Sequence, residues 1–238
     1  MKLLIDAGNT RIKWAFVQGE KWLRSGALPI EQASELAQHL NDISQMQQIW
    51  VSNVAGENVA KAICTFSSCP VNFITARETQ CGVRNHYTEP TQLGSDRWAA
   101  LIAAWHLIGG ACLVVNCGTA TTVDALTNQG EFIGGLILPS VAMMQGSLVI
   151  GTAQLKVGLG EYAAFPLSTA DAIVSGAIQA SCGAIQRQYN LLSNDVAPIV
   201  LSGGASTMLQ PHLNNLPVRS VDNLVLQGLW LIAQEANR

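Results

Sequence analysis

The sequence predicts an α/β protein built from two related halves, each a mixed sheet flanked by helices. Three observations favour this fold. A strand-and-glycine motif occurs twice, strand patterns alternate with helix patterns, and 49% of the residues are hydrophobic whereas only 12% are charged. An average soluble protein carries roughly 25% charged residues. The chain of 238 residues has room for two cores of about 100 residues each, and its low charge predicts a substantial subunit interface.

The repeated motif is a run of branched apolar residues followed by a small polar side chain and a glycine. The first copy reads Leu3-Leu4-Ile5-Asp6-Ala7-Gly8-Asn9-Thr10, and the second reads Leu113-Val114-Val115-Asn116-Cys117-Gly118-Thr119-Ala120. Each copy is typical of a strand that enters a tight turn. Glycine in such a turn permits a positive φ and a close approach to the backbone, and the turn amides can donate to an anion. Two such turns could hold one polyphosphate from both sides.

In the first half, the patterns predict a three-stranded meander followed by alternating helices and strands. The expected strands are residues 2–5, 12–17, 22–26, 48–53 and 71–75, and the expected helices are residues 31–40, 57–66 and 97–107. Residues 80–93 show no period and are expected to form a loop. Loops of this length inside a compact protein are often functional.

The second half repeats this plan. The expected strands are residues 113–115, 121–126, 132–137 and 198–201, and the expected helices are residues 139–150, 169–192 and 221–236. In the long helix, Ala172, Gly176, Ala180 and Gly183 recur at a spacing that permits close helix contact. We expect an N-terminal domain of residues 1–110 and a C-terminal domain of residues 111–238, with the helix over 221–238 a candidate to pack back on the first domain.

Composition and charge exclude several classes of protein. The formal net charge is −3 and no cluster of Lys and Arg forms a stripe, so nucleic acid is not an expected partner. Asp6 interrupts the first apolar run before it reaches signal-peptide length, which predicts a cytoplasmic protein. The apolar stretches 98–123 and 132–155 contain glycine, proline or polar residues that favour buried elements over a membrane span. The six cysteines lack metal-binding spacing and are expected to be reduced and mostly buried.

The first turn carries the groups that ATP binding requires. Within eight residues it offers the Asp6 carboxylate, a glycine, short polar side chains and the cations of Arg11 and Lys13. Amides and cations bind phosphates, and a carboxylate holds hydrated magnesium. The alternative is an ordinary hairpin in which Asp6 accepts backbone hydrogen bonds. The second copy of the turn, with Asp124 nearby, favours the functional interpretation. The pair Gly203-Gly204 could lie against a nucleotide base or ribose, although such pairs are more often only turns.

A sharper signal is Gly94-Ser95-Asp96-Arg97, which places an acid beside a guanidinium at the start of an apolar helix. Ser95 or Asp96 could simply cap that helix. Capping leaves Arg97 unexplained, because a cation at a helix N-terminus is disfavoured by a few tenths of a kcal/mol or more. An anionic partner would account for it. Asp96 could then accept a proton from a hydroxyl nucleophile while Arg97 holds a substrate carboxylate.

With these motifs the chain resembles the type III pantothenate kinases of bacteria, in the actin, Hsp70 and sugar kinase superfamily. The resemblance covers nearly the whole chain. Its motifs are Asp6-x-Gly8-Asn9-Thr10-x-x-Lys13, Tyr87-x-x-Pro90-x-x-Leu93-Gly94-x-Asp96-Arg97, Gly118-Thr119-Ala120-x-Thr122-x-Asp124, Gly134-Gly135-x-x-x-Pro139, Thr169-x-x-Ala172-Ile173-x-Ser175-Gly176 and Gly203-Gly204.

The resemblance implies a homodimer whose subunits each hold two RNase-H-like domains and phosphorylate pantothenate with ATP and Mg²⁺, the first step of coenzyme A synthesis. Asp96 matches the family's general base. The implied pantothenate contacts are Tyr87, Gly94, Ser95, Asp96, Arg97 and Thr169, and the implied ATP contacts are Asp6, Ala7, Gly8, Asn9, Thr10, Arg11, Ile12, Lys13 and Thr119. Asp6 would hold magnesium through water.

One position departs from the family pattern. The family also needs a monovalent cation, K⁺ or NH₄⁺, commonly held by an aspartate where this chain has Asn116. An amide oxygen can ligate a cation without supplying a full charge. The departure leaves open an accessory regulatory protein of the same fold that binds nucleotide without kinase turnover. A third possibility is a kinase of the superfamily with another small-molecule acceptor.

Overall fold

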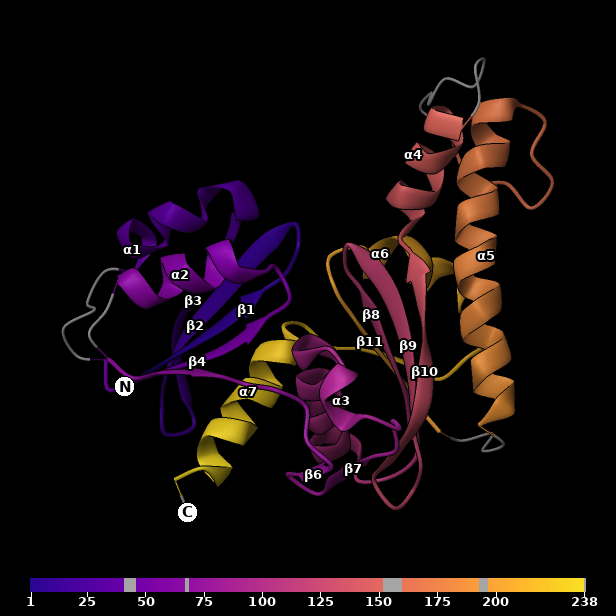
Figure 1. Cartoon of the computed structure of the whole chain (residues 1–238). Coiled ribbons are helices and arrows are strands. Elements are labelled where there is room, and N and C mark those ends of the chain that lie inside the picture. Colours follow the sequence, from indigo (N-terminus) through magenta and orange to yellow (C-terminus); the bar gives the residue numbers. More distant parts are fainter. Residues whose placement is uncertain (41–45, 67–68, 152–159, 193–196, 238) are drawn as a thin grey trace. The chain divides into compact units, whose positions relative to one another are not determined.

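A computed structural model describes residues 1–40, 46–66, 69–151, 160–192 and 197–237. The chain divides into two compact units (Figure 1). The first unit comprises Met1–Gly109, Gly130–Phe132 and Asn223–Arg238, and the second comprises Gly110–Gln129 and Ile133–Asp222.

The first unit contains a five-stranded sheet in the order β3-β2-β1-β4-β5. Its strands are β1 (Lys2–Ala7), β2 (Arg11–Gln18), β3 (Lys21–Pro29), β4 (Gln48–Asn53) and β5 (Val71–Phe73). The meander β1-β2-β3 is antiparallel, whereas β4 and β5 run parallel to β1. The meander expected from the sequence is therefore confirmed.

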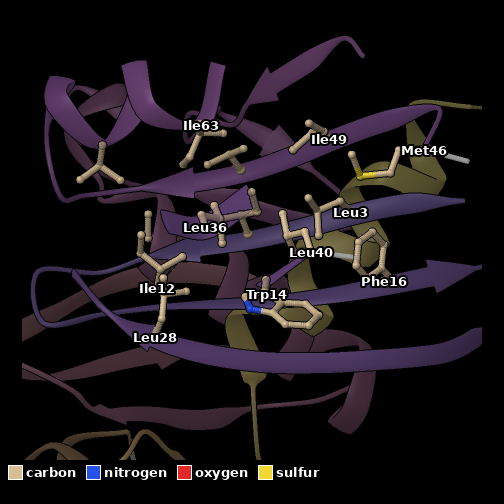
Figure 2. Close-up of a cluster of buried hydrophobic side chains, with 14 residues drawn as sticks. Leu3, Ile12, Trp14, Phe16, Leu28, Leu36, Leu40, Met46, Ile49 and Ile63 are labelled. Carbon is tan, nitrogen blue, oxygen red and sulfur yellow. The ribbon is translucent and has the colours of Figure 1, made fainter. Parts of the chain in front are cut away.

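Helices cover both faces of this sheet. Leu3, Ile5 and Ile49 point to one face, where they pack with side chains of α1 (Leu36–His39) and α2 (Glu57–Thr65), as Figure 2 shows for part of the cluster. Because side chains alternate along a strand, Asp6, Lys13 and Ser52 lie on the other face. That face contacts α3 (Ser95–Ile108) and α7 (Leu224–Glu235).

The helices α3 and α7 approach each other closely. A Cβ at Gly228 in α7 would lie 1.9 Å from the carbonyl oxygen of Ala99 in α3. The absence of a side chain at Gly228 is thus what lets the two helix backbones meet. Trp98 of α3 is fully buried, and its indole Nε1 donates a hydrogen bond of 2.9 Å to Oε1 of Gln80.

The second unit contains strands in the order β12-β11-β8-β9-β10. They are β8 (Cys112–Cys117), β9 (Ala120–Leu126), β10 (Glu131–Pro139), β11 (Ile199–Ser202) and β12 (Val218–Ser220). Here β8 is antiparallel to β9 and parallel to β11, which is parallel to β12. The strand order is the one found in the first unit, so the twofold repetition of the motif reflects repetition of the whole sheet topology.

The helices of the second unit are α4 (Val141–Gly151), α5 (Thr169–Leu191), α6 (Ser206–Leu209) and a 3₁₀ turn, Gln210–His212. Ile178 and Ile185 of α5 pack with Leu113, Val115 and Leu201 in its core. The predicted fold class, mixed sheets flanked by helices, is confirmed. At two of the four small residues of α5 the described chain makes no close contact, because a Cβ at Gly176 or Gly183 would meet no described atom within 4 Å.

Some predictions of local structure were wrong. The expected helix over 31–40 is in part a 3₁₀ helix (Ile30–Glu35), and residues 41–45 that follow it lie outside the described part. The expected loop 80–93 contains β6 (Thr79–Gln80), β7 (Val83–Asn85) and a 3₁₀ turn (Pro90–Gln92). Strands of two and three residues are too short to show a period. They are joined by Cys81 and Gly82 at φ 49° and 79°, and cysteine is not a usual turn signal.

Candidate active site

The first glycine turn joins β1 to β2 and displays its polar residues to solvent. The Gly8 N–H donates to the Arg11 carbonyl oxygen at 3.1 Å, and the side chains of Asn9, Thr10 and Arg11 are exposed. Ala7 and Ile12 are fully buried in the hydrophobic core. Of the expected ATP contacts in this turn, these two could therefore offer a ligand only their main chain.

The glycines of the two turns do not act as the sequence suggested. The expected positive φ is wrong, because Gly8 and Gly118 both lie outside the left-handed region. A Cβ at Gly8 would instead lie 3.4 Å from the Arg11 carbonyl oxygen, and one at Gly118 would lie 3.6 Å from that of Ala120. What these glycines provide is bare backbone beside the hairpin, which leaves room for a ligand to approach.

Three polar side chains form a row across the end of the first sheet. In the strand register Asp6 lies between Lys13 on β2 and Ser52 on β4. Burial and, to a smaller extent, the nearby Asp96 raise the pKa of the Asp6 carboxyl from 3.8 to about 7, against the opposing effect of Lys13. Two neighbouring carboxyl groups offer oxygen ligands of the kind that a divalent cation prefers.

The second turn repeats this row with different chemistry. Asn116 on β8 lies between Thr122 on β9 and Ser202 on β11. Uncharged Asn116 and Thr122 therefore stand where the first unit has Asp6 and Lys13. The parallel strand carries a serine in both units, Ser52 on β4 and Ser202 on β11. The turn is one residue shorter, since the Gly118 N–H donates to the Ala120 carbonyl oxygen at 3.0 Å. Thr119 is exposed.

Other candidate site residues of the second unit lie beside its turn, on β9 and at the start of α5. Gly203, at φ 99°, lies so close to Cys117 that a Cβ there would be 2.4 Å from the Cys117 carbonyl oxygen. The Asp124 carboxyl is almost fully buried, and Gly135 leaves room for it because a Cβ there would overlap one of its oxygens. Thr169 is the exposed first residue of α5, which Ser168 caps by accepting from the Asp171 N–H at 3.2 Å.

The start of α3 brings the acid of the Gly-Ser-Asp-Arg motif to the same face as Asp6. The N-cap position belongs to Gly94, which has no side chain with which to cap the helix. Ser95 Oγ lies 2.9 Å from Ser52 Oγ, and Asp96 Oδ1 accepts from the Arg97 N–H at 2.8 Å. The alternative in which Ser95 or Asp96 serves as the N-cap is therefore excluded. Asp96 remains partly exposed.

The Arg97 side chain is 5% exposed and lies against two aromatic rings. One of its terminal nitrogens donates to the Tyr87 hydroxyl at 3.0 Å, and its guanidinium carbon lies 5.7 Å from the Tyr87 ring centre and 5.9 Å from that of Phe132. The two rings attract the guanidinium and help to orient it. The guanidinium is thus held in place by aromatic groups, an arrangement consistent with the anionic partner expected from its helix position.

The loop before α3 is shaped by Asn85, a residue that sequence reasoning missed. Its side chain is 4% exposed, accepts from the Tyr87 N–H at 3.0 Å and donates to the Pro90 carbonyl oxygen at 3.1 Å. Phe132 and Ser52 were missed as well, because each lies far along the chain from the motif that it contacts. A period-two strand pattern shows that such residues are buried but not which side chains they meet.

The cysteines of the chain are less buried than the sequence predicted. Cys112 and Cys117 are buried, and burial raises both pKa values to about 12, whereas Cys64 is exposed. "Mostly buried" is thus too strong, although none of the six cysteines, all of which lie in the described residues, forms a disulfide. Within the described ranges, no group of three or more His, Cys, Asp or Glu side chains could hold a metal ion. No helix of the described residues is long and apolar enough to cross a membrane, and residues 152–155 of one apolar stretch lie outside them.

Comparison with known proteins identifies relatives of the fold and of the chain. A solved structure of a provisional Baf-family transcriptional activator from Campylobacter jejuni superposes with a TM-score of 0.64 at 24% identity, over 99% of this chain and 100% of that one. A provisional 2-dehydro-3-deoxygalactonokinase from Sinorhizobium meliloti gives the same TM-score at 16% identity, with 99% of both chains covered. At such identities the likeness establishes the fold alone, that of the actin-like and sugar kinase proteins.

Sequence comparison is more specific. A type III pantothenate kinase from Nitrosospira multiformis is 45% identical over 242 residues, which cover 99% of this chain and 92% of that protein. The family model described as type III pantothenate kinase matches residues 2–191. This match includes both glycine turns and the Gly-Ser-Asp-Arg motif. The chain belongs to the type III pantothenate kinase family.

Proposed function

We propose that this chain transfers the γ-phosphoryl group of ATP to the hydroxyl of pantothenate and so forms 4′-phosphopantothenate in the first step of coenzyme A synthesis. Membership of the family supports the reaction. The observation that carries the assignment of residues is the proximity of Asp96 to Asp6 on the α3 face of the first sheet. A proton acceptor and a phosphate-binding turn are thereby combined in one unit.

In this proposal Asp96 is the general base. It accepts the proton of the pantothenate hydroxyl as that oxygen bonds to the γ-phosphorus. The bond between the γ-phosphorus and the bridging oxygen breaks, and ADP leaves with the electron pair. Asp96 suits this role because it is partly exposed and begins a helix whose first turn is fixed by several contacts.

The substrate carboxylate is assigned to Arg97. A guanidinium that is held in place against two rings can bind a carboxylate through paired, charge-assisted hydrogen bonds. Tyr87, Gly94, Ser95 and Thr169 complete the proposed pantothenate contacts. The carboxylate at one end and the hydroxyl at the other would place pantothenate between Arg97 and Asp96, which are adjacent in sequence.

The ATP contacts are assigned to the first turn and to Thr119. The amides and side chains of residues 8–11 and the ammonium of Lys13 bind phosphate oxygens, and Asp6 holds Mg²⁺ through water. Magnesium supplies positive charge that neutralises the phosphates during transfer. The carboxyl pair of Asp6 and Asp96 fits this ion, because a cation would relieve the repulsion that raises the pKa of Asp6. A monovalent cation, K⁺ or NH₄⁺, is assigned to Asn116.

We also propose a homodimer, a cytoplasmic location and domains that divide near residue 110. The exposed apolar side chains of the second unit support the dimer: they include Ile133, Ile137, Ile150, Phe165 and Leu167, each more than half exposed. The small residues of α5 that lack close neighbours in the described chain add a second exposed surface. Sedimentation equilibrium should give twice the chain mass of 25.3 kDa.

A coupled assay for ADP formation tests the function. Purified protein is supplied with ATP, Mg²⁺ and pantothenate, with Na⁺, K⁺ or NH₄⁺ in turn. The proposal predicts 4′-phosphopantothenate with K⁺ or NH₄⁺ and little with Na⁺. Product from another acceptor alone would identify a different small-molecule kinase. No product under any cation, with ATP still bound, would favour the nucleotide-binding regulator.

A further inference from the structure

A buried hydrogen bond joins the sheet of the first unit to the helix that carries Asp96. Ser52 Oγ and Ser95 Oγ are 2.9 Å apart, and the two residues are 0% and 8% exposed. They lie 43 positions apart in the sequence. A buried hydroxyl pair of this kind is directional, and its loss would leave one hydroxyl without its partner.

Ser52 is held firmly on its own side. It lies in β4, where it is paired in register with Asp6 of the parallel strand β1. Just beyond it the Val54 N–H donates to the Ala7 carbonyl oxygen at 3.0 Å. The Ser52 hydroxyl therefore projects from a backbone fixed relative to Asp6.

The Ser52 hydroxyl is an important anchor for the first turn of α3. Its N-cap is a glycine, so a capping side chain does not anchor the first turn. Ser95 is the first helical residue and turns its hydroxyl to Ser52, while the next residue is Asp96. Most residues with a capping side chain could not replace Gly94 without moving Asp96, because a Cβ at Gly94 would lie 2.7 Å from Asp96 Oδ1.

We propose that Ser52 is a positioning residue for the phosphoryl transfer step, and that it acts through Ser95 to hold the Asp96 carboxylate at its working distance from Asp6. This inference rests on the proposed function, since it assigns a support to the proposed general base. It also changes the expected role of Ser95. Its hydroxyl serves the protein's own sheet and need not contact pantothenate.

The test is the single-turnover rate of phosphoryl transfer in Ser52→Ala, measured by rapid quench with enzyme in excess over ATP. The rate should fall by about tenfold, because small misplacements of a catalytic group cost one to two orders of magnitude. The KM values for pantothenate and for MgATP should stay within about twofold, since Arg97 and the first turn keep their contacts. Ser95→Ala should give the same loss, and the double variant should be no slower than either single variant.

The matched control is Ser181→Ala, which also removes a fully buried hydroxyl, one that donates to the Ala177 carbonyl oxygen in α5. It should turn over like the wild type. A Ser52→Ala rate equal to that of the control would overturn the inference. So would an unchanged rate with a raised KM for MgATP, which would mean that Ser52 acts through Asp6, and so would multiplicative losses in the double variant. The wild-type rate separates the two proposals: an inactive wild type refutes the function, whereas an active wild type leaves Ser52 to be judged by its variants.

Discussion

At the scale of single residues, the site depends on small groups that make room for charged ones. Gly94 leaves space for the Asp96 carboxylate, and Gly135 leaves space for that of Asp124. Neither glycine has the positive φ for which sequence analysis usually expects a glycine. Gly94 has φ −53° and ψ 137°, values open to any residue. What Gly94 provides is space beside the Asp96 carboxylate.

This argument predicts the behaviour of Gly94→Ala. The added Cβ would approach Asp96 Oδ1 to 2.7 Å, so the carboxylate must move while the backbone can stay. We expect kcat to fall by about tenfold with a nearly unchanged melting temperature. Gly110→Ala is the matched control, because a Cβ there would meet no described atom within 4 Å. Equal activity of the two variants would show that the space is not needed.

A second prediction concerns Asp6 and pH. Its pKa is raised from 3.8 to about 7 by burial and by Asp96. The folded protein therefore holds this proton more tightly than the unfolded chain, and the stability that it contributes is lost as the pH rises toward 7. Without metal ions, Asp6→Asn should be more stable than the wild type, by a margin that grows from pH 4 to pH 7 and then levels off. Activity should be lost.

The comparison variant for this pH series is Asp171→Asn. Hydrogen bonds from Ser168 and from the Glu161 N–H lower the pKa of Asp171. A lowered pKa contributes stability that is present above the unfolded value and lost in acid. In EDTA, chemical denaturation should show a growing margin of Asp6→Asn over the wild type from pH 4 to pH 7. The difference between Asp171→Asn and the wild type should stay nearly constant over that range and change only in more acidic solution. A pH-independent difference between Asp6→Asn and the wild type would contradict the account.

At the scale of elements, the packing of α3 against α7 determines where the site residues at the start of α3 lie. It carries Asp96 and Arg97 in its first turn and meets α7 at Ala99, one turn further along. Gly228→Ala would drive a Cβ into the Ala99 backbone, which cannot move aside as a side chain would. We expect the free energy of unfolding to fall by about 2 kcal/mol or more, with a loss of activity because the start of α3 shifts. Urea denaturation measures the first effect.

The control for Gly228→Ala is the same substitution at a helical glycine that has no close neighbour. Gly146 lies in α4, and a Cβ there would meet no described atom within 4 Å. Alanine is favoured over glycine in a helix by about 1 kcal/mol. Gly146→Ala should therefore stabilise the protein. If Gly228→Ala were stabilised as Gly146→Ala is, the close approach of α3 and α7 would not be what requires a glycine at position 228.

The elements also show what could be predicted from the sequence. Strands of six or more residues with apolar runs, such as β1, β2 and β4, were predicted at nearly their observed bounds because each signal is local. The hairpin β6-β7 was missed since it is too short for a period. Ser52 and Phe132 were missed for another reason: their partners, Ser95 and Arg97, are distant in sequence, and burial alone does not reveal the contact. The charge argument on Arg97 needed only the residue's position in the helix, which is local information, and the anionic partner that it predicts stays a prediction.

At the scale of the whole molecule, two sheets of one topology carry unequal rows of polar groups. Lys13, Asp6 and Ser52 in the first correspond to Thr122, Asn116 and Ser202 in the second. The first row combines charges of both signs, as phosphate and magnesium require together. The second is neutral. In the proposed function the first half therefore supplies the charged side chains for phosphate and magnesium, whereas the second half contributes the uncharged Asn116 and Thr119.

This division predicts the outcome of Asn116→Asp. A full negative charge at the proposed cation position should lower the concentration of K⁺ or NH₄⁺ needed for half-maximal activity, because a carboxylate binds a cation more strongly than an amide does. Asn116→Ala should raise that concentration. Activity is measured against cation concentration at constant ionic strength. Identical cation curves for all three proteins would remove the site from Asn116.

The central claim is that Asp96 takes the proton from pantothenate. Its most direct test is Asp96→Asn, assayed for single-turnover phosphoryl transfer and, in parallel, for pantothenate binding by calorimetry. The amide keeps the size of the side chain but cannot accept the proton. We predict a rate lower by at least about a hundredfold, with pantothenate still bound at an affinity within a few fold of the wild type. A near-normal rate of transfer in this variant would contradict the account.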